Sequence, residues 1–492
     1  MKASRTSRAV WYGVWGAMLG VAASSTLLYS PVFAGKWELG CSGLLAVAAG
    51  VQLLRGVGFL RRREVGLCWV LLIVFCAAQL VVFARASAPP SVKRGVDFSA
   101  YYLAGKVLDE SPGESIYDLP LFADGRLNLN VEDAPGTEWH AAAERFGVPF
   151  AAPYIYPPYF AVMMKPLARL PFAKAYLVWT VVTALAVVLA VLLSLSVAGV
   201  RVSGTLAVML GVGVFSYYPL WDNLFFGQIS GVILFLFAAG VWLLVRQRAL
   251  GSALCFAVAT MIKLTPVLVV PVLVIHRRWR WLAAYAVWMI ALLGFSVWQA
   301  GWGLHSEFVH KALPSMSCGA PVCQNTSVVA LVQEMFLRRV PVVAHPSETI
   351  PAEACAVSRW VALAIYLLML GRCFVKRRDG LVARDIVVIA MLGIAVSPIS
   401  WWHHSVLDLL PFIYLWGTGA AKGDRALTAG DWMLTALVLV VSTNVVGFVA
   451  LGLGNPVAQL VFAAIVPGLT IAVAWMMLGP GRGVAAEDFE AA

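Results

Sequence analysis

Long apolar stretches, separated by short clusters of arginine and lysine, follow one another along most of this chain. The stretches are about 18–22 residues long, and an α-helix needs about 20 apolar residues to cross the hydrocarbon core of a bilayer. A soluble domain has no way to bury so much continuous apolar surface. The pattern therefore predicts an all-α protein, a polytopic transmembrane bundle of about 11–14 helices.

Two long polar segments interrupt this pattern, and both are too long for a simple turn and too polar to be buried in lipid. We expect two large extracytoplasmic loops, at 87–171 and 301–358. The remaining units are N-terminal transmembrane helices at 1–86, a transmembrane bundle at 172–300, a C-terminal transmembrane bundle at 359–478 and a cytoplasmic tail at 479–492. The first apolar stretch, 11–34, is too long for a signal peptide, and we interpret it as a retained helix.

Composition agrees with a membrane protein, because 61% of the 492 residues are hydrophobic and only 12% are charged. The formal net charge of +11 comes from basic clusters between apolar stretches, among them 61–63, 277–280 and 376–378. This is the positive-inside pattern rather than a nucleic-acid-binding surface. We therefore expect a multi-pass protein of the inner (plasma) membrane, in contact with the bilayer and not with nucleic acid. Its two loops then lie on the periplasmic or extracellular side.

Two of the eight cysteines, Cys318 and Cys323, stand in the second polar segment with four residues between them. In an oxidising compartment this pair is a candidate disulfide, and Cys355 could compete as a partner. Zinc sites usually combine two such pairs, and the chain has one. We therefore predict no metal site.

The segment Arg94-Gly95-Val96-Asp97-Phe98 begins shortly after the third apolar stretch, in the first polar segment. A carboxylate at the boundary between water and lipid suits a general base that takes a proton from a hydroxyl of a membrane-tethered acceptor. The pattern around Asp97 is also that of a helix cap followed by an apolar-periodic helix. Both interpretations stay open on the sequence.

Two further segments could contact a substrate. In the run 154–159, paired prolines fix an extended entry to a helix, and the tyrosines either line a substrate site or anchor the chain at the membrane interface. In Gly227-Gln228, the amide precedes an apolar stretch, where it either caps a helix or binds sugar hydroxyls.

Lys263, in Lys263-Leu264-Thr265-Pro266, lies between apolar runs without a charged neighbour. A lysine at that depth is costly and usually has a partner or faces a wet cavity, and a phosphate would be a natural partner. The alternative is that its ammonium group extends to the lipid headgroups.

The segment Ser397–His404 ends in two adjacent histidines at the outer end of an expected span. In an α-helix neighbouring side chains point about 100° apart, so we expect only one of His403 and His404 to face a given site. His404 and Asp408 are four residues apart and could share a helical face, so that the carboxylate orients the imidazole or forms a structural pair with it. Zinc is disfavoured because no third ligand is near.

Together these segments resemble glycosyltransferase family 87, of the GT-C superfamily of membrane glycosyltransferases. The motifs that carry the resemblance are Asp-Phe-x-x-Tyr-Tyr-x-Ala-Gly, Tyr-Pro-Pro, Gly-Gln, Lys-Leu-Thr-Pro with a later Arg-Arg-Trp-Arg, and Ser-Pro-Ile-Ser-Trp-x-His-His. They occur in this order over about Gly95 to Trp416. The two additional apolar stretches before Asp97 and the Cys318/Cys323 pair depart from the family's minimal pattern.

The resemblance implies a GT-C type fold and a polyprenyl-phosphate sugar donor. It implies inverting transfer of a hexose, with mannose as the default, to a lipid-linked or cell-envelope glycan acceptor, without metal or other cofactor. The position of Asp97 matches the catalytic base. We expect the donor phosphate to be bound by His403, His404, Lys263 and Arg94. We expect the substrates to contact Tyr101, Tyr156, Gln228, Asn325 and Trp402.

The alternative function is a transporter or flippase of lipid-linked sugars. Such proteins usually contain internal repeats and charged residues in the middle of the membrane. No internal repeat is evident here, and the polar residues gather at one face. This favours the enzyme.

Overall fold

A computed structural model of the chain describes residues 94–121, 125–128, 135–200, 217–319, 325–337, 350–376, 382–414, 437 and 456–478. The retained helix expected at 11–34 lies outside these residues, as do the rest of the unit expected at 1–86 and the tail expected at 479–492.

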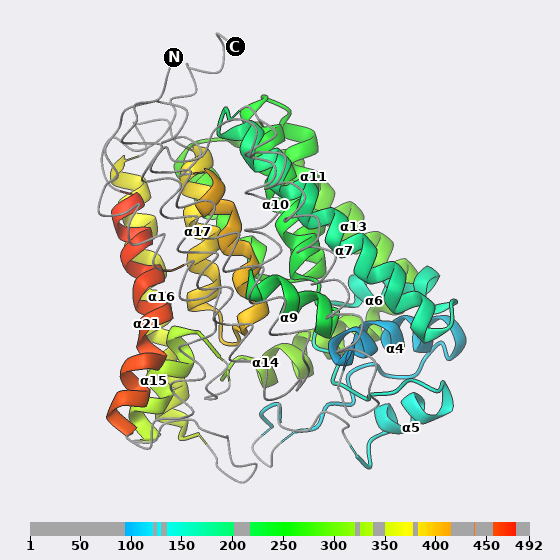
Figure 1. Cartoon of the computed structure of the whole chain (residues 1–492). Coiled ribbons are helices and arrows are strands. Elements are labelled where there is room, and N and C mark those ends of the chain that lie inside the picture. Colours follow the sequence, from blue (N-terminus) through cyan, green and yellow to red (C-terminus); the bar gives the residue numbers. More distant parts are fainter. Residues whose placement is uncertain are drawn as a thin grey trace, which may run out of the picture.

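Every regular element among the described residues is a helix, which agrees with the predicted all-α class (Figure 1). In chain order the described helices begin with α4 (Val96–Glu110), α5 (Glu138–Arg145), α6 (Pro158–Ala168), α7 (Phe172–Val197), α9 (Tyr218–Phe226), α10 (Ser230–Val245) and α11 (Ala249–Ile262). They continue with η3 (Thr265–Val269), α12 (Val270–Ile275), α13 (Trp279–Glu307), η4 (Phe308–Ala312) and α14 (Leu313–Met316). They end with α15 (Val328–Leu337), α16 (Ala352–Lys376), α17 (Val382–Val396), η6 (Trp402–Asp408) and α21 (Pro456–Met477).

Three apolar helical segments in the described ranges are long enough to cross a membrane: Phe172–Val197, Trp279–Met316 and Ala352–Lys376. The bent pair formed by Pro219–Phe226 and Ser230–Val245 passes the same test as one broken span. Several apolar helices of this length indicate a multi-pass membrane protein. The total of about 11–14 spans and the unit boundaries stay predictions.

The bend between α9 and α10 measures 119° and lies beside the polar residues of interest. α9 ends at Gly227, whose φ of 74° is left-handed, and the amide of Gln228 donates to the carbonyl of Asn223. This is the hydrogen bond that closes a Schellman-type helix end. A Cβ at Gly227 would come within 2.6 Å of the Cβ of Phe98, so only glycine fits here. The turn therefore presses Gln228 against α4.

The described part of the first polar segment forms α4, α5 and α6, and α4 packs on α6 at the end of the bundle where α14 and α15 also lie (Figure 1). α4 begins after Gly95, which has a φ of 74°. α6 begins with Pro157 and Pro158, since proline fits the first turn of a helix, where no amide donor is needed. The two helices thus hold the Asp97 and Tyr156 segments side by side.

The candidate disulfide between Cys318 and Cys323 is wrong, and the alternative partner, Cys355, is the one that pairs with Cys318, 37 residues later. Cys318 follows α14 and Cys355 lies in the first turn of α16, and both are buried with Ile350 and Ala354. Their Cα atoms are 5.2 Å apart, which suits a disulfide. Cys323 lies outside the described residues. The spacing along the chain does not reveal that the start of α16 folds back onto Cys318.

Candidate active site

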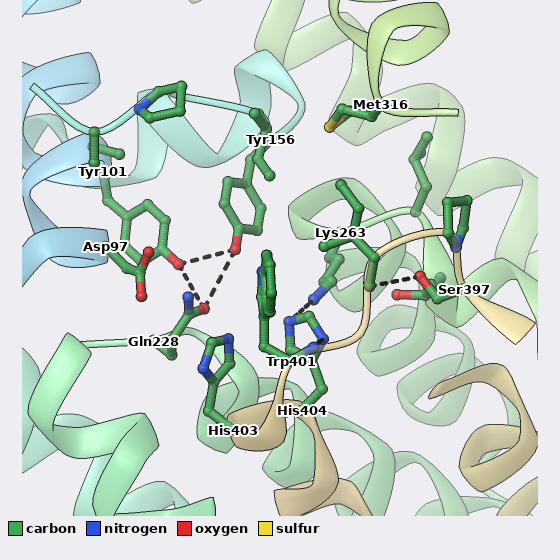
Figure 2. Close-up of a pocket in the computed structure, with 18 of the residues that line it drawn as sticks. Asp97, Tyr101, Tyr156, Gln228, Lys263, Met316, Ser397, Trp401, His403 and His404 are labelled. Carbon is green, nitrogen blue, oxygen red and sulfur yellow. Dashed lines mark hydrogen bonds between the residues drawn. The ribbon is translucent and has the colours of Figure 1, made fainter. Parts of the chain in front are cut away.

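A cavity of about 620 Å³ lies where α4, the segment before α6, the α9–α10 turn, the end of α11, α14 and the Ser397–His404 segment meet (Figure 2). Eight of the ten side chains predicted to bind substrate or catalyse line it: Asp97, Tyr101, Tyr156, Gln228, Lys263, Trp402, His403 and His404. They come from five separated parts of the sequence. The fold therefore brings these segments together at one site.

We define two sides of this cavity. The carboxylate side is Asp97, Tyr101, Tyr156 and Gln228, and the basic side is Lys263, His403 and His404. Figure 2 shows Asp97 on one side, Lys263 and His404 on the other, and the indole ring of Trp401 between them.

Asp97 is the second residue of α4, and its side chain is partly exposed to the cavity. The N-cap position belongs to Gly95, so Asp97 does not cap the helix. A carboxylate in the first turn is still stabilised by the partial positive charge of the helix N-terminus. Asp97 is therefore a first-turn carboxylate that faces the cavity.

Two tyrosines and one amide form a hydrogen-bonded cluster next to Asp97. The Tyr101 hydroxyl lies 2.9 Å from Gln228 Oε1 and 3.0 Å from the Tyr156 hydroxyl, which is itself 3.4 Å from Gln228 Oε1. Burial raises the pKa of the Tyr156 hydroxyl above its ordinary value, so it keeps its proton at neutral pH. The Gln228 amide oxygen therefore faces both hydroxyls.

The tyrosines of the 154–159 run are buried, so they are not aromatic anchors at the membrane interface. Tyr154 donates to the carbonyl of Pro157, and Tyr117 donates to the carbonyl of Tyr156. These bonds hold the extended entry to α6. Tyr156 is the member of the run whose side chain reaches the Tyr101–Gln228 cluster.

Lys263 ends α11 in an extended conformation and has a side-chain partner across the cavity, so its amine does not extend to the headgroups. Its Nζ atom lies 2.8 Å from Nε2 of His404. The other ring nitrogen of His404, Nδ1, accepts a hydrogen bond from the backbone amide of Trp401 at 3.1 Å. Both ring nitrogens of His404 are therefore occupied.

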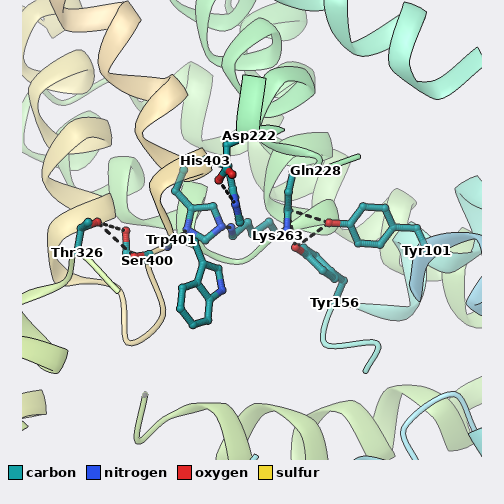
Figure 3. Close-up of polar contacts among 10 residues, drawn as sticks. Tyr101, Tyr156, Asp222, Gln228, Lys263, Thr326, Ser400, Trp401 and His403 are labelled. Atoms are coloured by element: carbon teal, nitrogen blue, oxygen red, sulfur yellow. Dashed lines mark hydrogen bonds and ion pairs between the residues drawn. The ribbon is translucent and has the colours of Figure 1, made fainter. Parts of the chain in front are cut away.

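His403 is held by a carboxylate that the sequence analysis did not single out. Its Nδ1 lies 3.1 Å from Oδ2 of Asp222 in α9 (Figure 3). Its Nε2 is buried and has no hydrogen-bond partner among the described residues. A polar atom left this way in a cavity wall is a candidate contact for a ligand.

The expectation that only one of the two histidines faces the site is wrong, because both line the cavity. The reason is that Trp402–Asp408 is a 3₁₀ helix rather than an α-helix, and the two rings meet edge to face with centroids 4.7 Å apart. In a 3₁₀ helix the residues that share a face are three apart. His404 therefore pairs with Lys263 and Trp401 rather than with Asp408.

Asn325 does not line the cavity, contrary to its predicted role in binding sugar hydroxyls. Its Nδ2 donates to the carbonyl of Pro398, and its Oδ1 accepts from the amide of Ser400. Thr326 adds a backbone bond to Ser400 at 2.7 Å and a side-chain contact (Figure 3). The pair 325–326 is thus a clamp that shapes the segment before the histidines.

Arg94 is also absent from the cavity lining. Its guanidinium lies over the ring of Tyr176, 4.9 Å from the centroid, which is a cation–π contact. Arg94 is only three residues before Asp97, but its side chain contacts Tyr176 and does not reach the cavity. The predicted contact with the donor phosphate is therefore not supported.

The cavity wall contains groups that sequence reasoning missed, of which Asp222 and Trp401 are the most important. Asp222 is an acidic residue in a largely apolar stretch, which is the signal in the sequence that points to it. Trp401 is adjacent to Trp402, and the sequence does not separate the roles of the two. The second polar segment also contributes Leu313, Pro314, Met316 and Ser317.

No group of three or more His, Cys, Asp or Glu side chains suited to a metal ion occurs in the part of the chain that the structure describes. That the reaction needs no metal or other cofactor stays a prediction.

Comparison with known proteins identifies the family. The model of glycosyltransferase family 87 matches residues 154–398. The chain is 30% identical over 331 residues to a polyprenol-phosphate-mannose-dependent alpha-(1-2)-phosphatidylinositol pentamannoside mannosyltransferase of Mycobacterium tuberculosis, covering 66% of this chain and 72% of that protein. A protein of the same name from Mycolicibacterium smegmatis is 25% identical over 328 residues, covering 66% and 76%. The chain therefore belongs to glycosyltransferase family 87 and is a membrane glycosyltransferase.

Proposed function

We propose that this enzyme transfers mannose from a polyprenyl-phosphate donor to a lipid-linked or cell-envelope glycan acceptor, with inversion at the anomeric carbon. The observation that carries the proposal is the shared cavity, in which a carboxylate faces a group of basic side chains. The relatives named above support the donor and the sugar, since both are mannosyltransferases that depend on polyprenol-phosphate-mannose.

Asp97 is the proposed general base. Its carboxylate takes the proton from the acceptor hydroxyl as the oxygen attacks the anomeric carbon and the bond to the donor phosphate breaks. A carboxylate that faces a cavity of this size can reach a bound hydroxyl directly or through one water. Attack from the face opposite the leaving phosphate inverts the configuration. Asp97 lies opposite Lys263 and His404 (Figure 2), and this arrangement supports this direction of attack.

The basic side is the proposed site of the donor phosphate. Charge grows on the phosphate as the glycosidic bond breaks, and hydrogen-bond donors fixed around it stabilise the transition state. Lys263, His403 and His404 supply nitrogen atoms from two elements. Gln228, whose amide oxygen faces the two tyrosine hydroxyls, has its NH₂ group left to contact a sugar hydroxyl.

Residues of α4, of α14 and of the segment before α6 line the cavity. These elements lie toward the end of the bundle where α5 and α15 also lie (Figure 1). The basic cluster 277–280 precedes or begins α13, at the opposite end of that helix from η4 and α14. By the positive-inside rule, the proposed site is on the periplasmic or extracellular side of the plasma membrane.

The test uses purified protein in lipid nanodiscs with a panel of polyprenyl-phosphate sugars, and it measures release of polyprenyl phosphate and the anomeric configuration of the product. The expected donor is polyprenyl-phosphate-mannose. Asp97→Asn should lower kcat by about 10²–10⁴-fold because it removes the base. Turnover of no donor in the panel would contradict the function, and full activity of Asp97→Asn would remove this residue from the mechanism.

The matched control is Asp109→Asn, on the same helix. Asp109 forms an ion pair with Arg169 at 2.8 Å and does not line the cavity. This variant should transfer mannose at the wild-type rate, which would show that loss of a carboxylate from α4 is not harmful in itself.

A further inference from the structure

The two contacts of His404 indicate which of its ring nitrogens carries a proton. The backbone amide of Trp401 can only donate, so Nδ1 of His404, 3.1 Å away, must be the unprotonated nitrogen. A neutral imidazole carries one proton, which is then on Nε2. Rotating the ring by 180° would break both contacts, so the ring orientation is fixed by its partners. A doubly protonated ring would point an N–H at the Trp401 amide, donor against donor.

The Nε2–H group of His404 points at Nζ of Lys263, 2.8 Å away. An ammonium group has three donors and no acceptor, so it cannot receive this proton. A neutral amine has a lone pair and can. The contact geometry therefore requires Lys263 to be uncharged while the site is empty.

The surroundings of Lys263 permit a change of charge. The residue follows an apolar helix, which disfavours a permanent ammonium group there. The charged and titratable groups that line the same cavity are Asp97 and Tyr101 on α4, Tyr156 before α6, Asp222 on α9, and His403 and His404 on η6. The Asp97 carboxylate favours a charged Lys263, while the neighbouring imidazole N–H favours a neutral one.

A second, smaller cavity of about 30 Å³ adjoins the first and is lined by Lys263, Thr265, Ser397 and His404 among others. This space is enough for one or two water molecules. A water molecule held there by these polar side chains could pass a proton to the amine of Lys263.

We propose that Lys263 and His404 form a phosphate clamp that is loaded with a proton when the donor binds. In the empty site the amine is neutral and accepts from His404. When the donor phosphodiester enters, the –NH₂ group of Lys263 takes up one proton from the buffered solution and becomes –NH₃⁺. Two N–H donors now face each other, and the pair opens so that both donate to one phosphate oxygen. The clamp rests on the proposed function, because it assumes a phosphate in this part of the cavity.

The first test measures proton uptake on binding, by titration calorimetry in buffers with different ionisation enthalpies. The ligand is polyprenyl-phosphate-mannose without acceptor, because its phosphodiester does not titrate near neutral pH. At about pH 8 the wild type should take up about one proton per donor bound. Lys263→Arg should bind the donor with no uptake, because a guanidinium group is always charged. The His403→Gln variant should keep the same proton count per bound donor, although it binds more weakly.

Binding of the donor to the wild type without proton uptake would overturn the clamp, and so would equal uptake in Lys263→Arg. Neither result would touch the proposed function if mannose is still transferred. Failure to bind or transfer any polyprenyl-phosphate sugar would instead contradict the proposed function.

A second test needs no donor. Acylation of lysines with acetic anhydride, followed by mass spectrometry, reports the pH at which each amine becomes neutral, because only the neutral form reacts. The rate at Lys263 should reach its plateau at a lower pH than the rate at Lys174, which is exposed near the start of α7. The shape of this curve does not depend on how fast the reagent reaches the residue. Identical curves would contradict a neutral Lys263 in the empty site.

Discussion

The two sides of the cavity differ in how their hydrogen bonds depend on protons. On the carboxylate side, two tyrosine hydroxyls meet the oxygen of an amide, and these groups keep their protons at neutral pH. On the basic side, each of the two contacts between side chains joins two ionisable groups: Lys263 with His404, and Asp222 with His403. A site built in this way holds the sugar end of a substrate with fixed donors and meets the phosphate end with a lysine–histidine pair whose protonation can change.

The largest effect is expected when a contact is removed from the basic side. His404→Ala should lower kcat/KM by about 10²–10³-fold, because it removes a donor aimed at the leaving phosphate. The variant should keep a thermal unfolding temperature near that of the wild type in the same nanodiscs. A loss of activity below tenfold would mean that the basic side does not carry the transition-state charge.

Removing the Cys318–Cys355 disulfide tests how far the position of the basic side depends on the second polar segment. Next to Cys318, Gly319 packs on the carbonyl of Pro398, so the Cys318–Cys355 bond helps to position the segment that contains the histidines. Cys355→Ser opens a loop of 37 residues and should destabilise the folded protein by about 3–4 kcal/mol. Unfolding in nanodiscs, compared with and without reductant, measures this. An equal response of wild type and variant to reductant would contradict the bond.

On the carboxylate side, Tyr156→Phe removes one hydroxyl from a cluster that keeps its other members. We expect about a tenfold loss of kcat/KM, which corresponds to a single neutral hydrogen bond. The loss should be independent of pH between about 6 and 8, because the tyrosine does not titrate there. A pH-dependent loss would show that the cluster of the two tyrosines and Gln228 also changes its protonation.

The smallest effect is expected outside both sides, at Asp109 on the same helix as Asp97. The hydrogen bond from Arg169 holds the pKa of Asp109 below its ordinary value. A lowered pKa in the folded state contributes stability at neutral pH, and this stability is lost as the pH falls through the lowered pKa. The contribution should be below about 1 kcal/mol, because the pair is at the surface. The difference in unfolding temperature between wild type and Asp109→Asn should vanish in acid.

The sequence predicts which residues line the cavity better than it predicts which of them contact one another. Asp97, Lys263 and the two histidines were found because a charged or titratable residue beside an apolar stretch is rare enough to be noticed. Asp222 was missed because its partner, His403, is 181 residues away, and no local pattern indicates the pairing. Asn325 was assigned to the substrate for a similar reason, since its bonds to Pro398 and Ser400 exist only in the folded chain.

Local geometry limited the prediction in a second way. The histidine segment was expected to be an α-helix, and the number of residues per turn decided which side chains face inward. The 3₁₀ helix at Trp402–Asp408 turns both rings into the cavity. The apolar pattern cannot separate the two helix types over seven residues. By contrast, the long helices α7, α13 and α16 coincide with apolar stretches of the sequence. The end of α13 and the start of α16 nevertheless lie within 301–358, the segment expected as a loop.

The bond between Cys318 and Cys355 also has a consequence for when the enzyme matures. Thiols are oxidised to such bonds outside the reducing cytosol. With the loop on the proposed side, a newly made chain would complete this part of its fold only after the second polar segment has been exported. Cells that lack an oxidising thiol pathway would then accumulate protein that is inserted in the membrane but poorly active. An oxidant added outside the cytosol would restore its activity without new protein synthesis.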